Sequence, residues 1–322
     1  MSKIKILLCT TLLANLYLDS VVYGSKSAFA QVADLGFYEN AVKSVIPGFR
    51  REFCPNLSSA DRVICETVPI KVVRNWAFLA SASEGGITIS AGLGYIFDSL
   101  SWGYVLSGDG GNSNDCFYEY FTYYIGIISA NTERARHNLP LMPAMSVANF
   151  PGQSPECRKN VHYNIALNDP YMREFQLKTV ESSISFVLLH EIGHVVKRHV
   201  AFEKSSISLQ RLREFEMEAD VWAMQAASNS KYNISGSMAP FFIGSLQGGT
   251  MDWEKNSDHP LGIRRLANFY RMVLDDLIKN PVRRSQLGSH YQDVLDENRE
   301  LKRRAENCLS VVQSGGDACP DE

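Results

Sequence analysis

The apolar and polar residues of this chain are arranged mainly as they are in helices. Apolar positions recur at helical spacing, or fill segments long enough for several helical turns. Prolines, glycines and polar clusters between these segments separate seven expected helices. Their ranges are 32–49, 93–106, 116–131, 174–198, 208–227, 263–278 and 281 to about 308. We therefore expect a fold that is mainly helical.

Strand-like patterns are confined to one region. Ile70–Val73 is short and β-branched, and residues 87–90 alternate between apolar and hydroxyl side chains. A Glu84-Gly85-Gly86 sequence just before the second segment favours a turn. Residues 54–65 favour a loop followed by a short turn. Together with the helices, these segments predict an α+β fold, mainly helical, with a small mixed sheet.

The most informative segment is the helix expected over residues 174–198, which is apolar on nearly all sides and therefore buried. It carries His190, Glu191 and His194, which are costly to bury without a partner. Residues four apart share one face of a helix, so both imidazoles can bind one zinc ion. Glu191 can then take a proton from the attacking water. The alternative is a pair of structural histidines on a core helix.

The third ligand of such a zinc site is expected on a different helix. A catalytic zinc ion has three protein ligands and one open position. A third histidine in the same helix would fall two turns after His194, at position 200, which is a valine. His199 is one residue off this position and is expected to face elsewhere.

Acidic residues on the helix expected over residues 208–227 supply the candidates. Glu216 and Asp220 are four apart and share a face. We choose Glu216 as the metal ligand, and Asp220 as the acceptor that orients a ligating histidine through its free ring N–H. Glu214 and Glu218 are expected on a solvated face.

Two motifs of this chain together resemble the signature of a zinc peptidase family. They are His190-Glu191-Ile192-Gly193-His194 and Glu216-Met217-Glu218-Ala219-Asp220. The family is the gluzincin family that includes the CAAX prenyl endopeptidases, HtpX and the periplasmic BepA-type proteases, and its second motif is Glu-x-x-Ala-Asp. The resemblance implies a zincin-like metallopeptidase with one zinc ion and a small mixed sheet that borders the cleft.

A second region is similar to the same family. Residues 75–78, 85–89 and 92–93 resemble its Asn-Ala-Phe segment, its Gly-Gly edge strand and its Gly-Leu pair. In the family this strand borders the cleft and can pair with an extended substrate backbone. The resemblance therefore implies a substrate edge strand. Its residues are Gly86, Ile87, Thr88 and Ile89.

Residues 258–266 resemble the family's His-Pro segment, in which an arginine follows the histidine by six residues. This carries over to His259 and Arg265, which would approach the zinc side of the cleft and donate hydrogen bonds to the developing oxyanion. The residues alone leave an alternative: His259 caps the start of a helix, and Arg264 or Arg265 lies on a solvated face.

The resemblance extends from about residue 70 to residue 271 and is interrupted once. Residues from about 107 to 178 intervene before the zinc helix, and they contain Cys116, Cys157 and a proline-rich stretch. We expect a disulfide-containing insertion over or beside the site, as a lid. Residues 31–322 as a whole are expected to form a single metallopeptidase domain, with a helical C-terminal segment over residues 281–322.

The N-terminus has the features of a secretion signal. Lys3 and Lys5 precede an apolar stretch over residues 6–18, and Ala28-Phe29-Ala30 supplies the small residues that a signal peptidase reads. We expect a signal peptide of residues 1–30 and an exported protein, periplasmic or secreted. The apolar stretch is shorter than the roughly 20 residues of a membrane span, so no stable span is expected after signal removal. The alternatives are an uncleaved anchor and a cytoplasmic protein whose N-terminus is a core helix.

Six cysteines would remain after removal of the signal, and an even number in an exported protein favours disulfides. Short loops close most easily, which favours pairing between neighbours along the chain. The expected pairs are Cys54–Cys65, Cys116–Cys157 and Cys308–Cys319. The alternative is a set of buried free thiols.

Charge excludes one class of partner. The net charge is −3, and no run of lysine and arginine is long enough for a phosphate-binding surface, so nucleic acid is not expected. The expected function is a zinc-dependent endopeptidase that hydrolyses peptide bonds of exported or envelope proteins, with a protein or peptide as substrate. The alternative is a zinc-bearing envelope chaperone or binding module with little proteolytic activity.

Overall fold

The structure, a computed structural model, describes residues 35–107, 169–202, 206–230 and 251–316, with a few positions between 123 and 142. Within these residues the chain is mainly helical with one small sheet, as the sequence predicts. The helices are α1 (Leu35–Phe53), α2 (Ser59–Thr67), α3 (Ala91–Ser107), α7 (Pro170–Val196), α8 (Leu209–Ser228), α10 (Met251–Lys255), α11 (Gly262–Lys279), α12 (Pro281–Leu287) and α13 (Tyr291–Gln313).

Helix α7 is the centre of the fold. Every residue from Ser182 to Gly193 is buried, because α1, α2, α3, α8 and two strands pack around this helix. The burial that the sequence predicts for His190 and Glu191 is therefore confirmed. The helix begins at Pro170, so residues 170–178 belong to it and not to the expected insertion.

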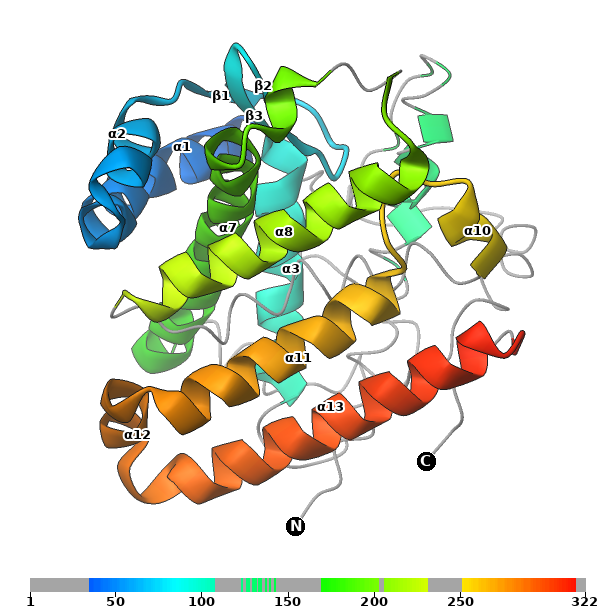
Figure 1. The fold of residues 1–322 in the computed structure, drawn as a ribbon. Coiled ribbons are helices and arrows are strands. Elements are labelled where there is room, and N and C mark those ends of the chain that lie inside the picture. Colours follow the sequence, from blue (N-terminus) through cyan, green and yellow to red (C-terminus); the bar gives the residue numbers. More distant parts are fainter. Residues whose placement is uncertain are drawn as a thin grey trace, which may run out of the picture.

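The helices after α7 form a second layer. In Figure 1, α8, α11 and α13 lie side by side across the front, while α7 and α3 cross behind them. The single helix expected from residue 281 is two helices, because Gly288 between α12 and α13 has a φ of 52°. No helix among the described residues is both long and apolar enough to cross a membrane.

Two expectations near the start of the described chain are wrong. Helix α1 does not end at residue 49 but continues to Phe53, because Phe49 and Phe53 extend its buried stripe. Residues 54–65 are not a loop and turn, since most of them belong to α2. Ser58 caps that helix by accepting a hydrogen bond from the backbone N–H of Asp61, at 3.3 Å.

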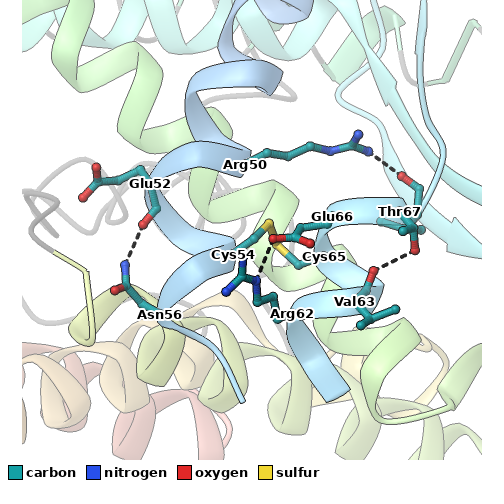
Figure 2. Close-up of a disulfide and its surroundings, with 10 residues drawn as sticks. Arg50, Glu52, Cys54, Asn56, Arg62, Val63, Cys65, Glu66 and Thr67 are labelled. Carbon is teal, nitrogen blue, oxygen red and sulfur yellow. Dashed lines mark hydrogen bonds and ion pairs between the residues drawn. A yellow bond between two sulfur atoms is a disulfide. The ribbon is translucent and has the colours of Figure 1, made fainter. Parts of the chain in front are cut away.

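The predicted disulfide between Cys54 and Cys65 is confirmed. Figure 2 shows that it joins α2 to the short 3₁₀ helix η1 (Cys54–Asn56) that follows α1. Cys308 is also disulfide-bonded, to a partner outside the described residues. Cys116, Cys157 and Cys319 lie outside them as well, as do the expected signal peptide and most of the expected insertion.

The sheet contains β1 (Ile70–Val73), β2 (Ala80–Ser83) and β3 (Gly86–Ser90), in the order β1-β3-β2. Strand β3 runs parallel to β1 and antiparallel to β2, so the sheet is mixed, as predicted. Because β3 is the middle strand and pairs on both sides, the expectation that Gly86, Ile87, Thr88 and Ile89 form a substrate edge strand is wrong. Among the described residues β2 is an edge strand, and it packs against α7 and the 3₁₀ helix η3 (His199–Ala201).

Candidate metal centre

Two adjacent helices supply most of the polar residues of the site. Helix α7 carries His190, Glu191 and His194, and α8 carries Glu216 and Asp220. Helical periodicity puts the two histidines on one face of α7, and the two carboxylates on one face of α8. The two helices pack against each other, and these two faces meet.

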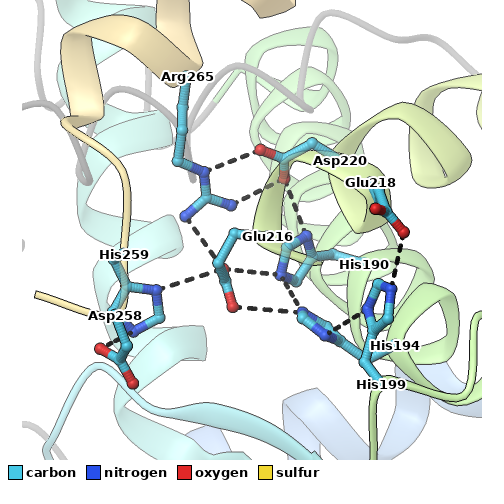
Figure 3. Close-up of polar contacts among 9 residues, drawn as sticks. All are labelled: His190, His194, His199, Glu216, Glu218, Asp220, Asp258, His259 and Arg265. Atoms are coloured by element: carbon cyan, nitrogen blue, oxygen red, sulfur yellow. Dashed lines mark hydrogen bonds and ion pairs between the residues drawn. The ribbon is translucent and has the colours of Figure 1, made fainter. Parts of the chain in front are cut away.

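His190, His194 and Glu216 converge, as Figure 3 shows. The Nε2 atoms of the two histidines are 3.1 Å apart, and each lies 3.4 Å from a different carboxylate oxygen of Glu216. One potential ligand atom from each residue lies within 4.8 Å of the other two. In the part of the chain that the structure describes, no other cluster of histidine, cysteine or acidic residues has this geometry.

Asp220 lies behind His190, where the sequence analysis expects it. Nδ1 of His190 is 2.8 Å from Oδ1 of Asp220, a contact that is short although bent from the ideal hydrogen-bond angle. Asp220 also accepts hydrogen bonds from Nε and Nη2 of Arg265, at 2.9 Å and 2.8 Å. A carboxylate can only accept, so Nδ1 of His190 carries a hydrogen, and Nε2, the ring nitrogen on the Glu216 side, is the one that can bind a metal ion when the ring is neutral.

His194 has a partner that the sequence analysis missed. Its Nδ1 is 3.1 Å from Nδ1 of His199, and Nε2 of His199 is 3.0 Å from Oε2 of Glu218. The expectations that His199 faces elsewhere and that Glu218 lies on a plain solvated face are therefore wrong. Glu214, by contrast, is exposed and pairs with Arg211 at 2.9 Å, as a solvated position should.

His259 and Arg265 also reach the site. Nδ1 of His259 is 3.2 Å from Oε2 of Glu216, and Nη1 of Arg265 is 3.7 Å from the same oxygen. The His259 side chain is half-exposed, whereas Arg265 is mostly buried and is held by Asp220. Of the two residues that the resemblance implies, His259 is the one more accessible from solvent.

A partly buried ion pair fixes the segment that carries His259. Glu254 in α10 accepts hydrogen bonds from Nε and Nη2 of Arg264 in α11, both at 2.9 Å. Arg213 of α8 donates to the backbone carbonyl oxygen of Glu254, at 2.7 Å. These contacts tie α8, α10 and α11 together and so place His259 beside Glu216. The solvated position considered for Arg264 is therefore wrong.

The site favours positive charge. Burial lowers the pKa of His190, but its contacts with Asp220 and Glu216 outweigh burial and raise this pKa to about 10. Burial raises the pKa of Glu216, yet contacts with three histidines hold it well below its usual value, so this carboxylate stays ionised. Burial also raises the pKa of Glu191, and a higher pKa makes its carboxylate a stronger proton acceptor.

The donor set fits a zinc ion. Tetrahedral zinc with bonds of about 2.0–2.1 Å separates neighbouring ligand atoms by about 3.3 Å, and the distances among the three residues are 3.1 Å and 3.4 Å. The cluster contains three carboxylates and one guanidinium, so a divalent cation would balance its charge when the histidines are neutral. These four groups belong to Glu191, Glu216, Asp220 and Arg265.

Gly193 lets α7 and α8 approach closely beside the candidate ligands. A Cβ at this position would lie 3.2 Å from the carbonyl oxygen of Ala219 and 3.3 Å from the Trp222 ring. We expect the substitution Gly193→Ala to push the helices apart by a few tenths of an ångström. It should lower the free energy of unfolding by about 1–3 kcal/mol and weaken metal binding, as urea unfolding and zinc titration would show.

Gly48→Ala, in α1, is the matched control for this substitution. Its added methyl group would first meet the flexible end of the Glu181 side chain, at 3.4 Å. Alanine is favoured over glycine inside a helix, so this variant should gain about 0.5–1 kcal/mol of stability. Equal effects of the two substitutions would contradict a special role for the close approach at Gly193.

Comparison with known proteins identifies a peptidase family. Residues 154–276 match the family model for Peptidase U49. The matched range contains α7, α8, α10 and nearly all of α11, and every residue drawn in Figure 3 falls within it. No curated protein and no solved structure matches the chain. The part of the chain that forms the candidate metal centre is therefore similar to a peptidase family.

Proposed function

We propose that the protein is a zinc-dependent metalloendopeptidase of the gluzincin kind, related to the CAAX prenyl endopeptidases, HtpX and the BepA-type proteases. The observation that carries this proposal is the convergence of His190, His194 and Glu216 from two neighbouring helices. The match to a peptidase family over the same residues supports it, as does the excess of buried carboxylates around them.

In the proposed mechanism, the two histidines and Glu216 hold one zinc ion. When bound, zinc lowers the pKa of a water molecule and polarises the scissile carbonyl. Glu191 accepts a proton from the attacking water and passes it to the leaving amine, a task that suits a buried carboxylate with a raised pKa. His259 donates a hydrogen bond to the carbonyl oxygen as its negative charge develops, and Arg265, whose Nη1 lies 3.7 Å from Oε2 of Glu216, supports the same charge.

The substrate is proposed to bind as an extended strand along β2. Strand β2 is an edge of the sheet among the described residues, and no described strand pairs with the other side of its backbone. It packs against α7 and η3, which carry His194 and His199. An extended peptide that adds to such an edge forms main-chain hydrogen bonds with it regardless of sequence.

We further propose that the protein acts outside the cytoplasm, on exported or envelope proteins. The Cys54–Cys65 disulfide supports this location, because disulfides persist in oxidising compartments. The N-terminal pattern of Lys3, Lys5 and Ala28-Phe29-Ala30 supports it as well. Mass spectrometry of the mature protein should find a chain that begins at Gln31, and an intact Met1 would contradict export by signal cleavage.

Metal analysis combined with a cleavage assay tests the proposed function. Purified protein should contain one zinc ion per chain and should cleave casein. A chelator should remove both the metal and the activity, and added zinc should restore them. Zinc binding without cleavage of casein or unfolded outer-membrane proteins would instead favour a chaperone or binding module. Protein purified without zinc, and unable to take it up, would contradict the proposed site.

A further inference from the structure

We infer that His199 and Glu218 position the zinc ligand His194, in a role that parallels that of Asp220 behind His190. This inference rests on the proposed zinc site. It assigns a function to a histidine outside the His-Glu-x-x-His motif, and to the acidic residue that lies between Glu216 and Asp220 in the second motif. Figure 3 shows the chain of contacts from His194 through His199 to Glu218.

The hydrogen-bond chain has a single consistent direction. The Glu218 carboxylate can only accept, so Nε2 of His199 donates to it. In a neutral imidazole the other nitrogen is then an acceptor, and Nδ1 of His199 accepts from Nδ1 of His194. When His194 is neutral, its Nε2 is then left without a hydrogen, and this atom lies 3.4 Å from the Glu216 carboxylate. The hydrogen bonds from His194 through His199 to Glu218 therefore select the tautomer of His194 that can bind zinc.

Packing holds the His199 ring in place. The ring is buried and lies flat on the Phe215 ring, with centroids 4.1 Å apart and an interplanar angle of 12°. The guanidinium of Arg211 lies over the Phe215 ring as well, at 4.4 Å. Arg211 also donates to Glu218, at 2.8 Å. One face of α8 therefore orients both the His199 ring and its carboxylate partner.

The backbone turns sharply to bring His199 to this place. Helix α7 ends at Val196, and Arg198 adopts a left-handed conformation with φ of 60° and ψ of 25°. It is the one non-glycine residue with positive φ in the described part of the chain. Such a conformation is disfavoured for a residue with a side chain. It ends the helix and allows η3 to fold back, so that His199 lies beside His194 instead of continuing along α7.

The two proposed histidine ligands thus have separate supports, and α8 contributes to both. His190 lies against Asp220, which Arg265 holds. His194 lies against His199, which Glu218 holds. Partners of this kind fix the ring orientation and raise the basicity of a ligand, and their loss reduces metal affinity by about 10–100-fold.

Two variants of His199 test this inference. Asparagine and leucine are similar in size, but only the Oδ1 atom of asparagine can replace Nδ1 of His199 as acceptor. Competition with a chromophoric chelator gives the zinc affinity of each variant. His199→Leu should weaken zinc binding by about 10–100-fold, whereas His199→Asn should retain most of the affinity. A purely structural role would not produce this rescue by asparagine.

A second pair of variants avoids the buried ring. Glu218→Ala removes the last acceptor of this series of hydrogen bonds, and Glu214→Ala removes the other carboxylate that pairs with Arg211. Glu218→Ala should weaken zinc binding by about 10-fold, and Glu214→Ala should leave it unchanged. If His199→Leu binds zinc as tightly as His199→Asn, and Glu218→Ala as tightly as Glu214→Ala, the inference is overturned, although the proposed zinc site is not. Wild-type protein that fails to bind zinc would instead overturn the proposed function.

Discussion

The substitution Glu191→Gln should leave zinc bound and should reduce peptide cleavage by about 10²–10⁴-fold, the usual contribution of a general base. Glutamine has nearly the shape of glutamate but cannot accept a proton from water at neutral pH. Glu191 lies on the ligand helix α7 and is buried. Its raised pKa, which burial causes, suits a group that takes up a proton and releases it again within one reaction cycle.

The measurement needs both readouts on the same sample. Zinc content reports whether the ligands still converge, and the rate of casein cleavage reports the chemistry. A variant that keeps its zinc and loses its activity would assign proton transfer to Glu191. Full activity with bound zinc would remove this residue from the mechanism, and loss of zinc would show that Glu191 has a structural role at the metal site.

The proposed metal ligands could be predicted from the sequence because much of their geometry is local. The spacing of His190 and His194 places both rings on one face of a helix, and the spacing of Glu216 and Asp220 does the same on α8. Which face of α7 meets which face of α8 is a long-range property. The sequence supplied it only through a resemblance between motifs, and the structure brings the residues together.

The support behind His194 could not be predicted, because it depends on how α7 ends. No glycine or proline marks the end of this helix at Val196. If the helix continued, His199 would not share a face with His194. Its actual place depends on the left-handed backbone of Arg198, which arginine does not favour. The sequence pattern therefore predicted that His199 and Glu218 would face away from the site.

The role of the strands was misjudged because one strand has a weak signal. Strand β2 consists of Ala80, Ser81, Ala82 and Ser83, and alanine is depleted in strands. The family resemblance implied that the well-marked strand β3 is the edge of the sheet, and the sequence pattern of β2 did not show that a further strand lies beside it. The structure shows β2 paired antiparallel to β3, so among the described residues the edge is β2, a strand that packs directly against α7. Pairing partners, and not strand propensity alone, determine which backbone is available to a substrate.

The substitution Glu216→Ala should remove zinc from the purified protein and abolish cleavage with it. This change deletes the only proposed ligand that does not come from α7. Loss of a group that merely orients a ligand costs about 10–100-fold in affinity, so loss of a ligand should cost more than about 100-fold. Equilibrium dialysis against buffered zinc, followed by metal analysis, measures the change directly.

Glu214→Ala is the matched control, because Glu214 precedes Glu216 by two residues on the same helix. Its side chain is exposed and pairs with Arg211, and exposed pairs of this kind contribute at most about 1 kcal/mol to stability. The control should therefore bind zinc and cleave casein like the wild type. If Glu216→Ala retained zinc with wild-type affinity, the carboxylate would not be a ligand. The 3.4 Å contacts of Glu216 with both histidines would then be ion pairs of a metal-free core, and the proposal of zinc chemistry would fail with them.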